Sequence, residues 1–319
     1  MKVYACDQFV LPLPAGHRFP MAKYARLRRR VASTASLAAT AAGAPTDRPA
    51  SFELHVPEAA SDAELVRAHR PDYVRRVAAG ALDPAEVRRI GFPWSPRLVE
   101  RSRRSVGGTI GACLAALDGD GVAVNLAGGT HHAAAARGEG FCVFNDVAVA
   151  ARVMQAERRA RRVLIIDLDV HQGNGTAAIF RRDPSVFTFS VHGQHNYPFE
   201  KETSDLDIAL PDGTDDGTYL EVVEAGLERA LERSRPDLAL YIAGADPFTG
   251  DRLGRLAVGK AGLAERDRLV FDIISGRAGL PVGVVMGGGY APEIDDIVDI
   301  HFATVREAAL RAASASAGV

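Results

Sequence analysis

The chain has 319 residues, of which 47% are hydrophobic and 24% charged, and its formal net charge is −2 at pH 7. This composition is typical of a folded protein and excludes a disordered chain or a fibre. The near-neutral charge argues against a surface built to bind nucleic acid or an anionic membrane.

The cysteines and the apolar runs bear on the cellular compartment of the protein. The three cysteines, Cys6, Cys113 and Cys142, form no C-x-x-C pair, which argues against a disulfide framework and favours a reducing compartment. No run of about 18 apolar residues exists, so we expect no membrane span. Because the first residues also lack the apolar stretch of a secretory signal, we expect a cytoplasmic protein.

Short β-rich runs alternate with longer amphipathic runs along the chain. Seven short runs, several nearly continuous in apolar residues, are predicted as strands: 3–6, 52–56, 122–126, 163–168, 186–191, 238–243 and 282–286. Six longer runs are predicted as helices: 21–39, 96–117, 145–158, 217–233, 256–274 and 292–312. Ser95-Pro96 and Ser61-Asp62 are typical helix starts. Strands separated by helices predict an α/β fold, with an open, mostly parallel sheet covered by helices on both faces.

Nothing in the chain marks a domain boundary. It contains no internal repeat and no low-complexity linker, and the stretch 32–49, rich in Ala, Thr and Pro, is interpreted as the end of a helix followed by a loop. The basic run 26–30 is interpreted as the solvated face of a helix and not as a nucleic-acid patch. Residues 1–319 are therefore predicted to form a single domain.

Histidine and aspartate residues gather after one predicted strand. Five of the nine histidines fall within one fifth of the chain: His131, His132, His171, His192 and His195. Asp167, Asp169 and His171 stand at alternate positions, so on an extended chain they would project to the same side. Two carboxylates and an imidazole so close together need a cation or a proton between them. Since carboxylate and imidazole suit Zn²⁺, we expect Asp169 and His171 to be two of the three protein ligands of a catalytic metal site.

The third ligand is expected at another strand end, because ligands of open parallel sheets bind beyond the carboxyl ends of the strands. Four segments share an apolar run followed by glycine or polar residues: 122–132, 163–171, 238–246 and 282–290. The third segment ends on Asp246. The fourth ends on three glycines and Tyr290, and glycines permit backbone turns that are closed to other residues. Each motif alone is compatible with a helix cap or a solvated turn, but the four together predict a site.

At these residues the chain resembles the zinc-dependent histone deacetylase family, within the arginase/deacetylase fold. The matching segments keep the family's order: 128–132, 140–146, 167–176, 243–246 and 287–290. The stretches 199–207 and 251–256 are most similar to the bacterial class IV branch. The resemblance implies hydrolysis of an amide by metal-bound water, which removes an acetyl or longer acyl group from a lysine side chain or a similar amine.

The resemblance also implies the metal ligands and the catalytic residues. The metal would be Zn²⁺, or Fe²⁺ where supply favours it, held by Asp169, His171 and Asp246. His131 and His132 would form the acid/base pair beside the metal-bound water. A tyrosine, Tyr290, would donate a hydrogen bond to the substrate carbonyl and to its developing oxyanion.

Further residues would support the site. By the resemblance, Asp167 would orient His131 and, together with Ser190 and the backbone near His171 and Val191, would help to bind a structural potassium ion. Asn174 stands where some family members carry an aspartate behind the second histidine. This neutral partner should leave His132 less basic than an aspartate would.

The resemblance implies a narrow substrate channel as well. The Gly140 carbonyl would accept the substrate amide hydrogen, and Phe141 would form one wall. Leu253 stands where a polyamine-binding relative would favour an acidic gate. No acidic rim residue is evident in 91–94, and the rim is instead assigned to His17, Arg18, Phe19, Trp94 and Tyr197.

Three alternatives stay open. The first is an acetylpolyamine or other small-molecule N-acyl amidohydrolase, so the substrate is expected to be an acyl-lysine peptide or protein, or a small acylated amine. The second is an arginase-type hydrolase with two Mn²⁺ ions, although the chain has Asp-x-Asp-x-His in place of Asp-x-His-x-Asp. The third is an inactive module that binds acylated amines. The oligomeric state is not predicted.

Overall fold

The computed structural model describes residues 1–40 and 52–315. At its centre lies one eight-stranded sheet in the order β2-β1-β3-β8-β7-β4-β5-β6, and every pair of neighbouring strands is parallel. The strands are β1 (Lys2–Tyr4), β2 (Glu53–His55), β3 (Val122–Asn125), β4 (Val163–Asp167), β5 (Val186–Gly193), β6 (Leu206–Leu210), β7 (Leu238–Ile242) and β8 (Val282–Val285). The predicted open parallel sheet is confirmed. The edge strand β6 was not predicted, because it is short and only partly buried, so its apolar pattern is weak.

The long helices follow the predicted runs. They are α1 (Ala22–Thr40), α5 (Pro96–Ala115), α6 (Asp146–Ala156), α8 (Asp216–Ser234), α9 (Lys260–Val270) and α10 (Ile294–Ala315). Two π-helical segments, η1 (Ala116–Asp120) and η2 (Phe271–Arg277), extend α5 and α9. The predicted helix end before residue 40 lies in α1, whereas the predicted loop at 41–49 lies outside the described residues.

Four short helices were not predicted: α2 (Asp62–Leu65), α3 (Pro71–Ala79), α4 (Pro84–Ile90) and α7 (Asn174–Phe180). Helices of fewer than three turns give too few residues for a helical period to show clearly. Start signals are nevertheless present at α2, α3 and α4, whereas α7 has no capping side chain. Ser61 forms a capping box with Glu64 at the start of α2, and Ser95 caps α5 ahead of Pro96, as the sequence indicates.

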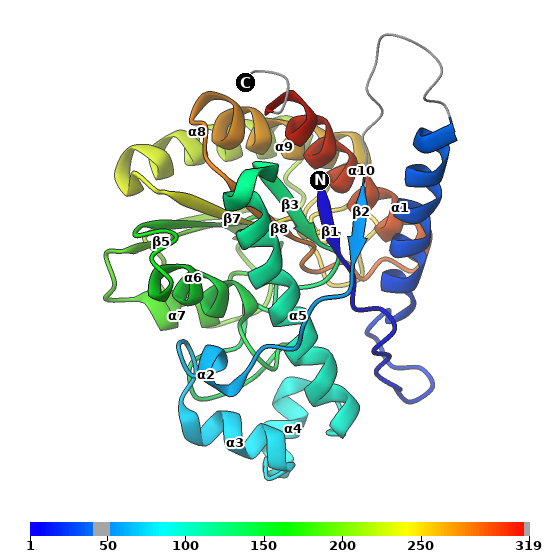
Figure 1. Cartoon of the computed structure of the whole chain (residues 1–319), viewed down its shortest axis with the longest axis vertical. Coiled ribbons are helices and arrows are strands. Elements are labelled where there is room, and N and C mark those ends of the chain that lie inside the picture. Colours follow the sequence, from blue (N-terminus) through cyan, green and yellow to red (C-terminus); the bar gives the residue numbers. More distant parts are fainter. Residues whose placement is uncertain (41–51, 316–319) are drawn as a thin grey trace.

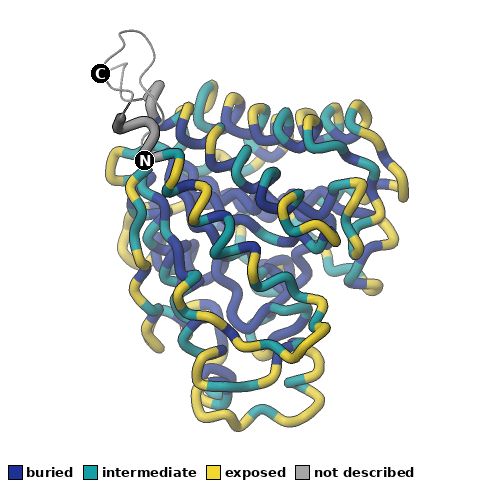
Figure 2. Tube along the Cα trace, turned by 90° about the vertical axis from the view of Figure 1, so that its right-hand side faces the viewer, coloured by how far each residue is buried: buried dark blue, intermediate teal, exposed yellow. Residues whose placement is uncertain are grey.

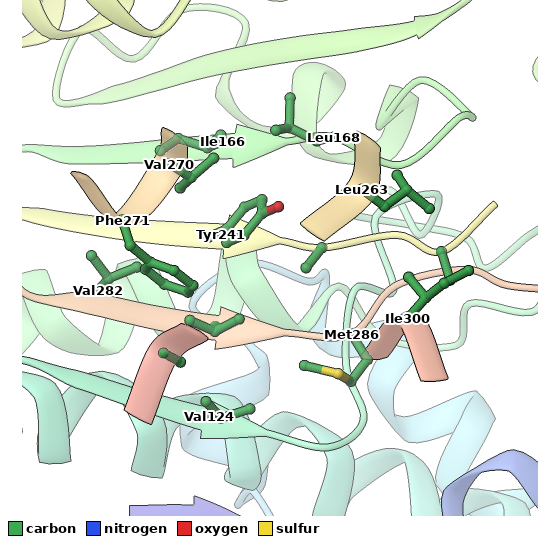
Figure 3. Packing of buried hydrophobic residues seen from close by; sticks show 14 of the residues in the cluster. Val124, Ile166, Leu168, Tyr241, Leu263, Val270, Phe271, Val282, Met286 and Ile300 are labelled. Atoms are coloured by element: carbon green, nitrogen blue, oxygen red, sulfur yellow. The ribbon is translucent and has the colours of Figure 1, made fainter. Parts of the chain in front are cut away.

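Helices cover and bury both faces of the sheet. Because successive side chains of a strand point to opposite faces, each strand contributes residues to both sides. In β7, Ala239 and Tyr241 belong to one hydrophobic cluster, and Leu240 and Ile242 belong to the other. The first cluster includes residues of α8, α9 and α10. Figure 3 shows Val270 and Phe271 beside Tyr241 of β7. The second includes residues of α3, α5 and α6. Figure 1 shows these two helical layers on either side of the sheet, and Figure 2 shows the buried strands between exposed outer segments.

The order of the sheet determines where the site lies. The strands β3, β8, β7 and β4 are consecutive neighbours at its centre, and because all are parallel their carboxyl ends meet at one edge. These are the four strands whose ends carry the histidine, aspartate and tyrosine residues of the predicted site. In the described part of the chain, no helix is both long and apolar enough to cross a membrane.

Candidate metal and catalytic site

Three predicted ligands meet at this edge. Asp169 and His171 follow β4, Asp246 follows the adjacent strand β7, and candidate ligand atoms of all three lie within 4.8 Å of one another. All three residues are buried. His171 Nδ1 lies 2.9 Å from Asp169 Oδ1 and 3.1 Å from Asp246 Oδ2. The sequence prediction of these three residues as one cluster therefore agrees with their placement.

Backbone amides hold the two carboxylates in place. The N–H of Gly288 donates to Asp169 Oδ2 at 2.6 Å, and the N–H of Val170 donates to Asp246 Oδ1 at 2.9 Å. Each carboxylate thus keeps its other oxygen on the imidazole of His171. A Cβ atom at Gly288 would collide with both carboxylates, so only glycine allows this approach of the loop after β8.

The electrostatics of the cluster favour a bound cation. Burial, followed by the charge of Asp169, raises the pKa of Asp246 to about 7. Burial alone would lower the pKa of His171, but its hydrogen bonds to Asp169 and Asp246 outweigh this effect and raise the pKa to about 10. The two buried carboxylates therefore favour the protonated, positively charged form of His171 that lies between them. A divalent metal bound at the same place would supply this positive charge directly.

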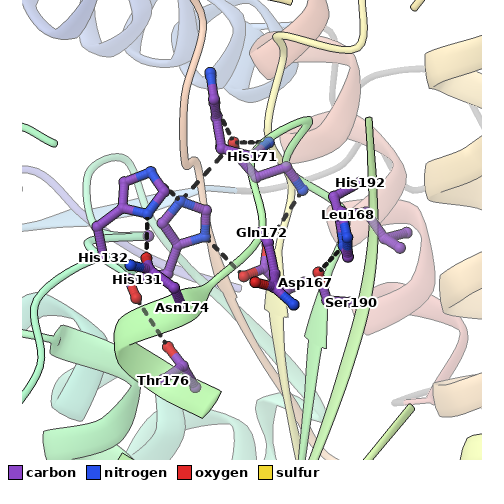
Figure 4. Close-up of polar contacts among 12 residues, drawn as sticks. His131, His132, Asp167, Leu168, His171, Gln172, Asn174, Thr176, Ser190 and His192 are labelled. Atoms are coloured by element: carbon purple, nitrogen blue, oxygen red, sulfur yellow. Dashed lines mark hydrogen bonds and ion pairs between the residues drawn. The ribbon is translucent and has the colours of Figure 1, made fainter. Parts of the chain in front are cut away.

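The adjacent histidines after β3 lie beside this cluster with their ring nitrogens facing each other. His131 Nε2 is 3.2 Å from His132 Nε2, and His131 Nε2 is 3.9 Å from Asp169 Oδ1. Behind them, His131 Nδ1 contacts Asp167 Oδ2 at 2.7 Å, and His132 Nδ1 contacts Asn174 Oδ1 at 2.7 Å. Figure 4 shows the two rings side by side, each with its own partner.

The two partners make the histidines differ. Burial disfavours the charged form of His131, but the charges of Asp167 and Asp169 outweigh it and raise the pKa to about 9. Burial, and then the neighbouring charges of His131 and His171, hold the pKa of His132 well below its ordinary value. The pKa of His131 therefore lies well above that of His132, and such a difference between two neighbouring groups suits proton transfer.

One geometric expectation was wrong. Asp167, Asp169 and His171 do not share one extended face, because β4 ends at Asp167 and the chain turns there. Asp167 contacts His131 and accepts the backbone N–H of Asp169 at 3.2 Å, so it lies behind the histidine and outside the ligand cluster. Side chains alternate between the two faces only as long as the chain remains an extended, hydrogen-bonded strand.

The residues expected at a potassium site lie beside this region. Ser190 pairs in register with Asp167, and Val191 is the next residue of β5. The hydroxyl of Ser190 lies 2.9 Å from Nδ1 of the buried His192 (Figure 4). Burial lowers the pKa of His192 to about 4.

The predicted channel residues line a pocket that leads to the ligand cluster. An inner cavity of about 70 Å³ and an outer pocket of about 440 Å³ meet at five shared residues: His132, Gly140, Phe141, His171 and Tyr290. Tyr197 and Leu253 line the outer pocket. Trp94, expected at the rim, lines neither, because its indole donates to the Val77 carbonyl and packs over Gly80.

The turn at Gly140 and Phe141 is held by helix α4. The backbone N–H of Gly140 donates to the Arg89 carbonyl at 3.1 Å, and that of Phe141 donates to the Ile90 carbonyl at 2.8 Å. Phe141 has a left-handed backbone, with φ at 66°. This conformation places its ring against Phe92 and 6.0 Å from the ring of Tyr290. The short helix that the sequence did not indicate therefore fixes one wall of the pocket.

Sequence reasoning missed several supporting residues. Asp146 at the start of α6 accepts the backbone N–H groups of Gly129 and Thr130, at 3.1 and 2.7 Å, and so fixes the loop before the histidine pair. The motif 140–146 was the available signal. Lys23 is buried, and its ammonium lies 3.4 Å from the carbonyls of Gly287 and Gly289; burial lowers its pKa to about 8.

Two buried charged residues support the ligands from further away. Glu139 accepts from Asn174 Nδ2 at 2.6 Å and from the Tyr197 hydroxyl at 3.1 Å, so it connects the second histidine to the pocket wall. Arg266 pairs with Asp267 and donates to the Gly244 carbonyl at 2.6 Å, two residues before Asp246. No local pattern in the sequence distinguishes either residue from an ordinary surface charge.

A parallel α/β sheet with a two-carboxylate, one-imidazole cluster and a histidine pair at its carboxyl edge defines the class of protein. The sequence model of the histone deacetylase domain matches residues 22–305. The chain belongs to the histone deacetylase family.

Individual relatives agree with this assignment. The chain is 45% identical to an uncharacterized protein of Picosynechococcus sp. strain PCC 7002, over 94% of this chain and 95% of that protein. It is 32% identical to the acetoin utilization protein AcuC of Bacillus subtilis, over 75% of this chain and 67% of that protein. It is 33% identical to histone deacetylase 2 of Arabidopsis thaliana, over 73% of this chain but only 62% of the plant protein.

The fold is also shared with solved structures. The crystal structure of a histone deacetylase homologue from Aquifex aeolicus has a TM-score of 0.75 and 24% identity, and covers 95% of this chain and 83% of that chain. The eight-stranded sheet is therefore the arginase/deacetylase fold that the resemblance implied.

Proposed function

We propose that this protein is a single-domain, metal-dependent hydrolase that removes a short acyl group, such as acetyl, from a lysine side chain or a similar amine. The observation that carries the proposal is a cluster of three potential metal ligands at one cavity. Two of these ligands, Asp169 and His171, line the cavity together with the two unequal histidines and Tyr290. The family relationship and the solved homologue in complex with SAHA support it; that homologue is 25% identical, with a TM-score of 0.75.

The donor set fits a divalent metal. Asp169, His171 and Asp246 offer two oxygens and one nitrogen, the number that a catalytic zinc site uses while keeping a position open. Fe²⁺ would suit the same donors. When bound, such an ion would lower the pKa of water and polarise an amide carbonyl.

The protein's own residues would move the protons. His132, kept neutral by burial and by its charged neighbours, can accept a proton on Nε2, while Asn174 occupies its Nδ1. His131, charged through Asp167, would stabilise negative charge that develops beside it. The same Nε2 of His132 can then return its proton to the leaving amine.

Tyr290 and Gly140 would orient the amide. Tyr290 lies at the junction of the inner cavity and the outer pocket, where its hydroxyl would donate to the substrate carbonyl oxygen. Gly140 lines the same junction, and its carbonyl would accept the substrate N–H. Phe141 and Tyr290 would enclose the alkyl stem between aromatic rings and exclude water from it.

The size of the inner cavity favours a short acyl group. Its volume of about 70 Å³ is well below the roughly 150 Å³ of an apolar cavity that admits benzene. An acetyl group fits such a space, whereas a fatty acyl chain would require the surrounding side chains to move.

A panel of substrates tests the proposal. Acetyl-lysine peptide, long-chain acyl-lysine peptide and N-acetylputrescine would each be incubated with the Zn²⁺-loaded protein, with the chelated protein and with Tyr290→Phe. We expect release of acetate from the peptide that chelator abolishes and Tyr290→Phe strongly reduces. Tyr4→Phe is the matched control, because Tyr4 is a residue of β1 that lines neither the inner cavity nor the outer pocket.

The other outcomes separate the alternatives. Turnover of the polyamine alone would place the protein among small-molecule amidohydrolases. Two manganese ions per chain in metal analysis would favour the arginase-type chemistry. Binding of the acyl-lysine peptide without turnover of any substrate would support the inactive binding module.

A further inference from the structure

The mouth of the pocket carries arginines and no acidic side chains. Arg18, Arg89, Arg252 and Arg255 line the outer pocket, and Arg88 lines an adjoining pocket of about 400 Å³ beside Gly140. Among the residues that the structure describes, no aspartate or glutamate lines either pocket. We call these five arginines the arginine rim.

Most of the arginine rim is not neutralised within the protein. Arg18, Arg88, Arg89 and Arg252 are exposed and make no ion pair with any residue in the described ranges. Only Arg255 has a carboxylate partner, Asp212, which it shares with His195. Their charges are therefore available to a ligand in the mouth.

Glu139, the acidic residue behind Tyr197, does not offset the rim. Its side chain is buried, accepts from Asn174 and Tyr197, and pairs with Arg137. It therefore presents no free carboxylate oxygen to a ligand in the mouth.

Composition does not explain the rim. The chain has 38 basic and 40 acidic residues, so an average surface carries both signs. Arg88 and Arg89 also lie in the last turn of α4, where positive charge favours the helix dipole. Arg18 and Arg252 have no such local reason, because they lie in loops before α1 and after β7. Segments far apart in the sequence therefore contribute the same sign of charge to one opening.

The charge of the mouth bears on the part of the substrate that stays outside the pocket. In the proposed reaction the acylated side chain enters the pocket and the rest of the molecule remains among the arginines. A substrate with lysine or arginine beside the acylated side chain would place like charges together, whereas a substrate with carboxylates there would be attracted.

We propose that the enzyme selects acylated amines that carry negative charge next to the acylated side chain, such as acetyl-lysine flanked by acidic residues. This inference rests on the proposed function, because it assumes that the acylated side chain occupies the pocket. The negative charge could come from flanking side chains or from the α-carboxylate of a free acyl-amino acid, which present the same chemical group.

Three peptides of equal length, each with one acetyl-lysine flanked by Glu, Gln or Lys, test the inference. We expect kcat/KM for the Glu peptide to exceed that for the Lys peptide by roughly 10-fold at low ionic strength. The ratio should fall toward one at about 1 M salt, where the Debye length is about 3 Å. A reversed or equal ratio at low salt would overturn the inference.

Charge reversal at the rim locates the effect. In Arg252→Glu and Arg89→Glu, the ratio between Glu and Lys peptides should drop at least about 3-fold, and comparison within each variant cancels any loss of folded protein. Arg67→Glu, an exposed arginine that lines neither pocket, is the matched control and should keep the wild-type ratio. A ratio unaffected by both rim variants would show that the arginines do not select the substrate.

Binding separates failure of this inference from failure of the proposed function. Fluorescence anisotropy of the same peptides, labelled, needs no turnover. If no peptide is hydrolysed but affinity still follows the order Glu, Gln, Lys, the proposed function is lost and the rim assignment stands. Equal affinities, or no binding, would overturn the assignment.

A comparison of free Nε-acetyl-lysine with its α-amide distinguishes the two sources of negative charge. Faster turnover of the free acid would show that one α-carboxylate suffices. Equal rates would assign the effect to the flanking residues.

Discussion

The inner end of the pocket and its mouth differ in charge, in burial and in how their residues are held. At the inner end, Asp167, Asp169 and Asp246 are buried and bonded to histidines and to backbone amides. At the mouth, Arg18 and Arg252 are exposed, and their guanidinium groups have no partner among the described residues.

The difference shows how one fold separates reaction from recognition. Buried charges act strongly because little water screens them, so they must be fixed in position and paired. Exposed charges act weakly one by one, but several of one sign around an opening can steer a substrate. Changes at the inner end should therefore affect rate and stability greatly, and changes at the mouth should mainly affect which substrate is used.

The largest expected effect follows from removing a metal ligand. Asp246→Asn should lower metal affinity by well over the roughly 100-fold loss that outer-shell substitutions cause, and should leave no measurable deacylase activity. Metal content by mass spectrometry after dialysis, with circular dichroism as the control for folding, would measure this. Retention of stoichiometric metal would contradict the ligand assignment.

Removing the oxyanion donor should cost less. Tyr290→Phe is expected to lower kcat by about 10²–10³-fold, with metal binding intact, because Tyr290 is outside the ligand cluster. Steady-state kinetics on acetyl-lysine peptide would measure the loss. Near wild-type kcat would remove Tyr290 from the mechanism.

The contrast in burial predicts a contrast in stability. Arg266→Met should lower the free energy of unfolding by about 3–5 kcal/mol, because it leaves the buried Asp267 without its charge partner. Arg252→Gln at the mouth should stay within about 0.5 kcal/mol of wild type. Chemical denaturation of both variants gives the comparison, and equal effects would contradict it.

A smaller effect on rate is expected from the support of the second histidine. Asn174→Ala should lower kcat by about 10–100-fold and change the pH profile, since His132 loses the partner of its Nδ1. Glu139→Gln keeps the shape of the side chain that bonds Asn174 and should cost less. A pH profile of Asn174→Ala identical to wild type would show that Asn174 does not position His132.

The smallest expected effect concerns acid stability. Burial lowers the pKa of His69 to about 4, below the ordinary 6.5, and its ring nitrogens contact the Ala134 carbonyl and the Asn145 N–H. As the pH falls, the unfolded chain therefore protonates His69 before the folded protein does. The free energy of unfolding should fall as the pH drops from about 6.5 to 4, and at pH 5 this residue should have cost about 2 kcal/mol relative to neutral pH. His69→Gln should show a shallower loss between pH 7 and pH 5 in urea denaturation. If the free energy of unfolding of His69→Gln fell with pH as steeply as that of the wild type, His69 would not be a source of the loss in acid.

The sequence was informative about the site where chemistry stands directly after a buried strand. Asp169, Asp246 and Tyr290 could be placed together because β4, β7 and β8 are apolar, hence central, and parallel, hence aligned at their carboxyl ends. It was uninformative about how the chain turns after the end of each strand. The position of Asp167 behind His131 depends on a turn after β4 that no alternation rule describes.

The sequence by itself determined the α/β class, the long helices and the residues that meet at the edge of the sheet, since apolar patterns indicate which strands are buried and parallel strands end at one edge. Only the tertiary structure decided which charges are paired. Glu139 and Arg266 are buried partners, whereas Arg18 and Arg252 share the pocket mouth unpaired. Periodicity indicates whether a residue is buried, but it does not give the residue's partners. Asn174 and Tyr197, which donate to Glu139, and the Gly244 carbonyl, which accepts from Arg266, come from distant segments that only the tertiary structure brings together.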